Sequence, residues 1–207
     1  MLKSGLVLLS SFYLVFCSSH SFAESVLAEQ ETYSELEEAS YNLCGNSERT
    51  RLLAQLIVED SDQLRESLQC NEQLASIAQS KAEEMASQGK VSHYGIEGGP
   101  DRRLMASGYR LYLPDDAIEG NHVEAVQGGY SSAYDVLDNF KNSYQHRVHL
   151  FGEHAFFLQQ DEIGVGYASN WDTPHVDYWV VYIASQKHPD ADKNVKPASS
   201  EKQSDNK

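Results

Sequence analysis

The clearest pattern in the chain is a set of apolar residues at helical spacing in three stretches. The stretch SERTRLLAQLIVED and the stretch after Asn71 each carry four apolar residues on one helical face. Asn71 is a favourable N-cap, and Gly89 is a typical C-terminal stop. A third helix is expected from about Ser132 to Tyr144. The predicted buried positions are Leu52, Leu53, Leu56 and Ile57, then Leu74, Ala78, Ala82 and Met85, and finally Val136, Leu137 and Phe140.

Two later segments, EIGVGYAS and YWVVYIAS, are typical of β-strands, and the turn-rich NWDTPHVD joins them. The region from Gly95 to Gly120 holds glycines, two prolines and no sustained period, so it is expected to be mostly loop. Helices followed by neighbouring strands predict an α+β fold with an antiparallel sheet.

The N-terminus has the features of a signal peptide. Lys3 precedes the apolar run GLVLLSSFYLVF, and small residues at Ser21 and Ala23 predict cleavage after Ala23. Cys17 raises a lipoprotein alternative, but the bulky Phe16 before it argues against that alternative. No later stretch is apolar enough to span a bilayer, so the mature protein is expected to be exported and soluble, in a periplasm or outside the cell.

The remaining chain divides by composition into three parts. Residues 24–45 form an acidic leader, residues 46–186 the folded domain, and residues 187–207 a polar tail that is expected to be disordered. Removal of the signal peptide takes away one basic residue, so the net charge of −15 becomes −16. This charge excludes a nucleic-acid partner or an anionic membrane surface, because both require a basic face.

Two cysteines remain after cleavage, Cys44 and Cys70, and in an oxidising compartment an isolated pair predicts a disulfide. The most concentrated set of chemically active residues is NSYQHRVHLFGEH, which holds His146, His149 and His154. Such a cluster is compatible with metal binding, acid–base chemistry or an ordinary surface. His93 and Glu124 are further candidates, although a loop histidine and an isolated glutamate are most often surface residues.

Five weak motifs occur in an order that resembles the CAP superfamily, which includes cysteine-rich secretory proteins, antigen 5 and pathogenesis-related 1 proteins. These are NSER, SHYG, DRRLMASGY, EAVQGGYSSAYDVLDNFKNSYQHR and the final strand pair, and they cover roughly residues 46–185. Glu124 precedes His146 by 22 residues, the separation expected between the family's glutamate and its second histidine. The chain is most similar to the small bacterial exported members.

The resemblance implies an α–β–α sandwich with a central antiparallel sheet and a surface cleft of two histidines and two acidic residues. By motif, His93 and His146 correspond to the cleft histidines and Glu124 to the first glutamate. The second acidic position falls at Ser143, which leaves one carboxylate, and Ala125 replaces the family's asparagine. His149 and His154 match no cleft position and are expected to be surface imidazoles.

Three functions follow as hypotheses. In the first, the chain is a non-enzymatic exported protein that binds a divalent ion, a small molecule or a lipid. His93, Glu124 and His146 would be the metal ligands, with zinc the expected ion and water completing the site. In the second, the same cleft acts as a peptidase-like hydrolase, although no G-x-S-x-G or H-E-x-x-H pattern supplies a nucleophile or a metalloprotease site. In the third, the chain is an interaction module whose cleft is vestigial.

Overall fold

A four-stranded sheet of order β1-β3-β4-β2 lies at the centre of the computed structural model. β3 (Glu162–Ser169) and β4 (Asp177–Ala184) pair antiparallel along their whole length, which confirms the predicted strand pair and its turn. β2 (Glu124–Gly128) adds antiparallel to β4, whereas β1 (Gln69–Cys70) adds parallel to β3. The sheet is therefore mixed. The expectation of a purely antiparallel sheet was wrong at this edge, because the short β1, which precedes the second predicted helix, runs in the same direction as β3.

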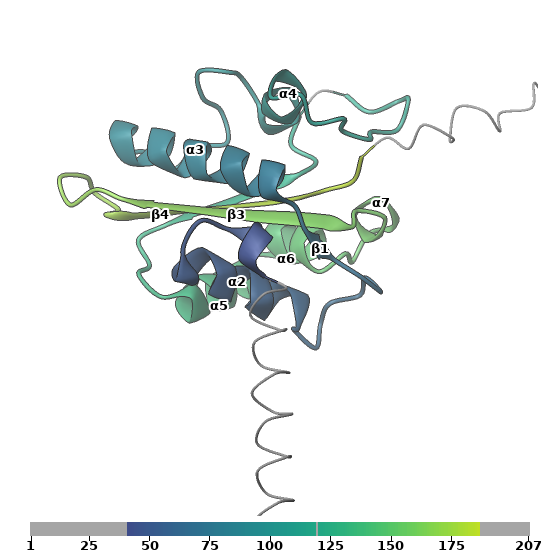
Figure 1. The fold of residues 1–207 in the computed structure, drawn as a ribbon, viewed down its shortest axis with the longest axis horizontal. Helices are drawn as coiled ribbons and strands as arrows, with labels where there is room; N and C mark the ends of the chain where they lie inside the picture. The colour runs from purple at the N-terminus through teal and green to yellow at the C-terminus, as the bar shows by residue number, and fades with distance from the viewer. Residues whose placement is uncertain (1–40, 119, 187–207) are drawn as a thin grey trace, which may run out of the picture. The chain divides into compact units, whose positions relative to one another are not determined.

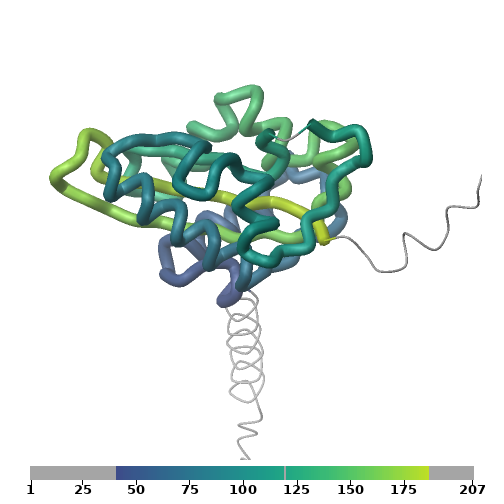
Figure 2. Tube along the Cα trace, turned by 90° about the horizontal axis from the view of Figure 1, so that it is seen from above, coloured from purple at the N-terminus to yellow at the C-terminus, as the bar shows by residue number. Residues whose placement is uncertain are grey.

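Helices cover both faces of the sheet, so the α–β–α arrangement of an α+β fold is confirmed (Figure 1). On one face lie α3 (Glu72–Gln88) and α4 (Pro100–Ala106), and α3 runs over the β3–β4 hairpin in both views (Figure 2). The other face carries α2 (Glu48–Val58), α5 (Ala133–Asn142) and α6 (Tyr144–Leu150), and α7 (Ala155–Leu158) follows.

Strand β4 divides its side chains between two apolar cores, as a period of two requires. Trp179, Val181 and Ile183 pack with α2 and α5, and the intervening Tyr178, Val180 and Tyr182 pack with α3 and α4. All of these side chains are buried, so the strand lacks the polar face of a half-exposed sheet.

The predicted helix signals are present in the structure. Asn71 Oδ1 accepts a hydrogen bond from the Leu74 amide, and Gly89 ends α3 in the left-handed region at a φ of 65°. Ser132 caps α5 by accepting from the Tyr134 amide. The apolar stripes of the three predicted helices are buried or partly buried.

Two glycines of β3 let α3 approach the sheet closely. A Cβ at Gly164 would overlap the backbone of Leu74 and Ala75, and a Cβ at Gly166 would overlap the backbone of Ala78. The interior of a protein is packed too tightly to absorb such an overlap without a shift of the helix. These positions therefore set the depth at which α3 lies on the sheet.

The structure describes residues 41–118 and 120–186. The predicted signal peptide, residues 24–40 of the acidic leader and the tail of residues 187–207 lie outside the described residues. The described part begins before the predicted boundary at residue 46, with a 3-10 turn, η1 (Asn42–Cys44), whose Cys44 is buried. Cys44 is joined to Cys70 by a disulfide, as predicted.

Three elements differ from the sequence predictions. The expected loop after Gly95 contains helix α4, which Pro100 opens at a favourable first-turn position. Strand β2 was not predicted, because its five residues begin with the buried acid Glu124 and show no apolar alternation. The third helix ends at Asn142 instead of the expected Tyr144, and His146 lies within the separate helix α6.

Candidate functional site

Three of the predicted site residues meet at one cavity of about 380 Å³. His93 is carried by the loop after α3, Glu124 is the first residue of β2, and His146 lies in α6. Residues from both helical layers thus reach the cavity at the β2 edge of the sheet. Its lining consists of His93, Asn121, Glu124, Tyr144, Gln145, His146, Val148, His149 and Phe157.

Glu124 is buried, and both of its carboxylate oxygens have protein partners. Oε1 lies 2.9 Å from Nδ1 of His93. Oε2 accepts from Nη1 of Arg103 at 2.8 Å and from the hydroxyl of Tyr182 at 2.5 Å. Since a carboxylate only accepts, Nδ1 of His93 is the donor, and the neutral ring keeps its lone pair on Nε2. A carboxylate behind a histidine in this way fixes the tautomer and the orientation of the ring.

Arg103 and Tyr182 hold this carboxylate in place by donating to it. Burial opposes the charge of Arg103, but Tyr182 and Glu124 outweigh it and raise the pKa of the guanidinium. Burial, and then the charge of Glu124, raise the pKa of Tyr182 well above its ordinary value, so the phenol stays protonated and donates. Nη2 of Arg103 also donates to the backbone carbonyl of His93 at 2.9 Å. The same guanidinium therefore fixes both the carboxylate and the loop.

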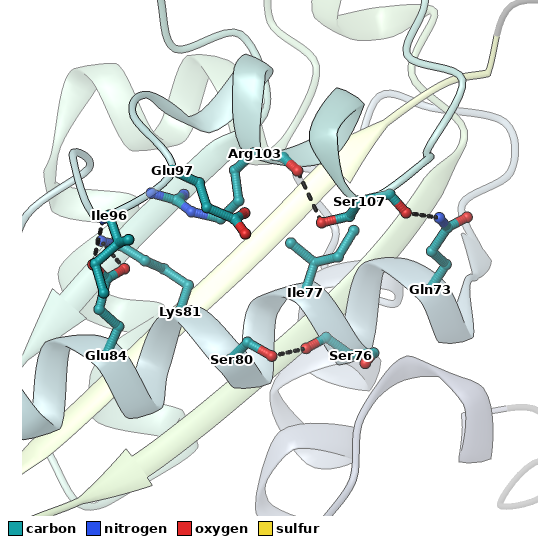
Figure 3. A pocket seen from close by; sticks show the side chains of 10 residues that line it. All are labelled: Gln73, Ser76, Ile77, Ser80, Lys81, Glu84, Ile96, Glu97, Arg103 and Ser107. Carbon is teal, nitrogen blue, oxygen red and sulfur yellow. Dashed lines mark hydrogen bonds and ion pairs between the residues drawn. The ribbon is translucent and has the colours of Figure 1, made fainter.

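An ion pair on α3, between the buried Lys81 and the partly buried Glu84, also holds the loop that follows His93 (Figure 3). Nζ of Lys81 donates to Glu84 at 3.1 Å and to the carbonyl of Tyr94 at 3.2 Å. The other oxygen of Glu84 accepts from the amide of Ile96 at 2.8 Å. Because these bonds reach backbone atoms just after His93, they restrict the loop that presents the imidazole.

His146 lines the same cavity as His93, and its pKa is lowered. Burial, and then the proximity of His93, lower the pKa of His146. Its ring stands edge-on to Phe140, with the ring centroids 4.9 Å apart. Nδ1 is buried without a hydrogen-bond partner among the described residues. Most buried polar atoms in proteins are hydrogen-bonded, so this nitrogen is an exception that needs a chemical reason.

His149 was predicted to be a surface imidazole, and this prediction was wrong. The ring is buried, and burial together with the nearby Arg65 lowers its pKa to about 3. The reason is the start of a new helix at Tyr144, which turns His149 inward three residues after His146, on the same helical face. That i, i+3 spacing was the sequence signal for a shared cavity. His154 is exposed, as predicted.

Ser143, the position of the missing second acid, is not among the cavity-lining residues. It lies at the junction of α5 and α6 as the cap residue of both helices. Across residues 41–118 and 120–186, no three His, Cys, Asp or Glu side chains are grouped closely enough to form a metal site. No helix in this part of the chain is long and apolar enough to cross a membrane.

Comparisons with known proteins bear on the fold. No protein-family model matches the chain, and no curated protein matches it. Among solved structures, an outer surface protein from Borrelia burgdorferi is similar, with a TM-score of 0.54 and 18% identity over 68% of this chain and 95% of that chain. At this level of identity the similarity concerns the fold alone. Membership of the CAP superfamily stays a prediction.

Proposed function

We propose that the chain is an exported protein of the CAP type, without enzymatic activity, whose cleft binds a divalent cation through His93 and His146. The observation that carries this proposal is the Glu124–His93 bond at 2.9 Å, because it directs the lone pair of His93 away from the buried carboxylate. Export is supported by the Cys44–Cys70 disulfide, since disulfides persist in oxidising compartments.

The donor set fits a weak cation site. Two imidazoles face one cavity, and a lowered pKa keeps His146 neutral, as a metal ligand must be. Nδ1 of His146 has no hydrogen-bond partner among the described residues, so this ring retains an unused polar atom. We assign Glu124 to orienting His93 instead of the direct ligation predicted from the sequence, because all of its described bonds go to protein donors. Zinc is the expected ion, since imidazole suits it and water can fill open positions.

The hydrolase alternative has less support. Among the described residues, the cavity lining holds no serine, threonine or cysteine to act as a nucleophile. The tyrosine nearest the carboxylate, Tyr182, is held protonated and donates to Glu124. Ligand binding therefore accounts for the cavity better than covalent catalysis does.

Calorimetric zinc titration tests the proposal with four variants of the protein. We expect one site of modest affinity in the wild type. His93→Ala and His146→Ala should each weaken binding by about tenfold or more, the usual scale for losing a ligand or its orienting partner. His154→Ala is the matched control, because this imidazole is exposed and lies outside the cavity. His149→Ala belongs in the series, since His149 also lines the cavity.

The pH dependence gives a second measurement. Affinity should fall at acidic pH, because protonated rings do not ligate, and the lowered pKa of His146 keeps that ring neutral to a lower pH than an ordinary imidazole. Binding that survives both His93→Ala and His146→Ala would place the site elsewhere. Absence of zinc binding by the wild type would leave a small polar ligand or a vestigial cleft as the remaining hypotheses.

A further inference from the structure

A groove of about 400 Å³ lies between α3 and α4 (Figure 3). It shares no lining residue with the cavity of His93 and His146, which we call the histidine cleft. One wall is a single face of α3, because its lining residues recur at intervals of three and four positions. The other wall comes from α4, its C-terminal end and the loop before it. We call this cavity the α3–α4 groove. Its residues on α3 are Gln73, Ser76, Ile77, Ser80, Lys81 and Glu84.

Hydrogen bonds close the α3–α4 groove at both ends. At one end, Nε2 of Gln73 donates to the carbonyl of Ser107 at 3.0 Å. At the other end, Glu84 accepts from the amide of Ile96 at 2.8 Å. Gln73 and Glu84 are eleven positions apart on α3, which corresponds to about 16 Å along the helix. The open part between these ends has room for a small elongated molecule.

The loop side of the groove is a tight turn. The backbone groups of Gly95 and Gly98 bond to each other at 3.1 and 3.0 Å, which places Ile96 and Glu97 at the tip. Gly98 has a φ of 94°, a conformation that glycine adopts without strain. Nη2 of Arg103 donates to the carbonyl of Gly98 at 3.2 Å. The tip is therefore held in place above the groove by contacts with its own walls.

Glu97 is the charged residue of the lining that has no partner among the described residues. Lys81 pairs with Glu84 at 3.1 Å, and Arg103 pairs with Glu124 at 2.8 Å. The side chain of Glu97 is exposed, and it makes no hydrogen bond or ion pair within the part of the chain that the structure describes. In Figure 3 its carboxylate extends over the groove. After the pairing of the buried charges, one negative charge is left for a ligand.

Apolar surface and hydroxyl groups complete the lining. Ile96 is next to Glu97 at the tip and is 89% exposed, and Ile77 belongs to the α3 wall. Ser76 and Ser80 are one helical turn apart on that wall, and both are exposed. The hydroxyl of Ser76 has no hydrogen-bond partner among residues 41–118 and 120–186. The groove therefore combines an anion, an aliphatic surface and a neutral polar group.

We propose that the α3–α4 groove binds a short aliphatic amine, with its ammonium group on Glu97 and its methylene chain against Ile96 and Ile77. An ammonium group only donates hydrogen bonds, as a free carboxylate requires. A neutral polar end of the ligand would reach the hydroxyl of Ser76. The net charge of −15 favours a cationic ligand over an anionic one. A metal ion is disfavoured, because the described residues contain no group of three acidic, histidine or cysteine ligands.

The experiment compares three ligands of one length by calorimetric titration. They are 5-amino-1-pentanol, 1,5-pentanediol and 5-hydroxypentanoate, which share a methylene chain and a hydroxyl end and differ in the charge of the head. We expect one saturable site for the amine. The diol and the carboxylate should bind at least about tenfold more weakly, because neither forms a charge-assisted hydrogen bond with Glu97.

Glu97→Gln should weaken binding of the amine by about tenfold or more, for the same reason. Because Glu97 is exposed and unpaired among the described residues, this variant should keep the melting temperature of the wild type. Glu83→Gln is the matched control: Glu83 is an exposed acid of α3 outside the groove, bonded to Gln79 at 2.9 Å. It makes the same change in net charge and should bind the amine like the wild type. Ile96→Ser should weaken binding without any change in charge.

Three results would overturn the proposal. Unchanged binding in Glu97→Gln would place the amine outside the α3–α4 groove. Equal weakening in Glu97→Gln and Glu83→Gln would show general attraction by the net charge instead of a site. Absence of saturable binding by the wild type, or equally tight binding of the diol or the carboxylate, would exclude the proposed ligand class.

Discussion

Nδ1 of His93 lies 2.9 Å from Oε1 of Glu124, so the one carboxylate that the described residues place in the histidine cleft is bonded behind an imidazole. The other oxygen of Glu124 is bonded to Arg103 and Tyr182. The buried acid therefore acts on the cleft through the ring of His93. The same hydrogen bonds of Glu124 therefore stabilise the fold and orient the ring of His93.

Glu124→Gln should lower stability and weaken zinc binding together. Removing the anion leaves Arg103 as a buried cation without its partner, a change that costs about 3–5 kcal/mol in comparable buried pairs. Urea denaturation measures the loss. Glu153→Gln is the control, because Glu153 pairs with the partly exposed Arg147 at 2.8 Å. That exposed pair should contribute about 1 kcal/mol or less.

His149→Gln should flatten the dependence of stability on pH. Burial and Arg65 lower the pKa of His149 to about 3, whereas the unfolded chain has the ordinary value of 6.5. Between these values the unfolded state binds the extra proton, so the wild type loses stability as the pH falls. One such group contributes a slope of up to about 1.4 kcal/mol per pH unit. Urea denaturation from pH 4 to 7 measures it, with the exposed His154→Gln as control. An unchanged slope in His149→Gln would contradict this assignment.

Arg65→Met should destabilise the region of α6 and α7. Arg65 is buried and donates to three backbone carbonyls, those of His149 and Leu150 at 2.8 Å and that of Phe157 at 3.1 Å. Burial lowers its pKa to about 10, which still leaves the guanidinium charged at neutral pH. Each of these carbonyls keeps a second donor, from Gly152, Gln63 or Gln160, so the loss is that of three hydrogen bonds to a charged group. Such bonds contribute about 1.5–3 kcal/mol each, and a total loss of about 3 kcal/mol or more is expected. Thermal melting compares this variant with Arg102→Met, a change at an exposed arginine; equal melting temperatures would refute the role of Arg65.

Gly166→Ala should be among the most damaging small substitutions in the sheet. The added methyl would overlap the backbone of Ala78, so α3 must shift. Overpacking of this kind typically costs about 1–3 kcal/mol, and more where backbone is the obstacle. Gly120→Ala is the control, because its nearest contact is an ordinary 3.6 Å. The urea concentrations at which the two variants are half unfolded measure this loss. A Gly166→Ala variant as stable as the wild type would show that α3 can shift without cost.

The exported protein should contain no free thiol from Cys44 or Cys70, and its reduction should weaken the fold. The two cysteines are 26 positions apart, a loop whose closure contributes about 3 kcal/mol in the chain-entropy model. The bridge joins the turn before α2 to the strand before α3. Thiol titration under denaturing, non-reducing conditions, followed by denaturation with and without reductant, measures both. Two reactive thiols per chain would contradict the bridge.

The elements that local chemistry specifies were predictable. Asn71 and Gly89 fix the ends of α3, and the alternating cores of β4 follow from its apolar run. The site was predictable only where motif order placed it, at His93, Glu124 and His146. The burial of His149 was not predictable, because it depends on the break between α5 and α6 at Ser143. Arg103 and Tyr182 were missed because they are far apart in sequence, and only tertiary packing brings them to Glu124.

Phe157 belongs to the walls of two cavities, the one lined by His93 and His146 and a neighbouring one of about 530 Å³, and its ring centroid is 5.1 Å from that of His149. A ligand that moves this ring from one cavity changes the wall of the other. Whatever factor such a ligand in the second cavity imposes on the affinity for zinc, zinc must impose on the affinity for that ligand, because the two routes to the doubly bound state have the same free energy. A zinc titration repeated with the second cavity filled therefore measures the coupling free energy of the shared wall, and its sign tells whether the two ligands assist or exclude one another.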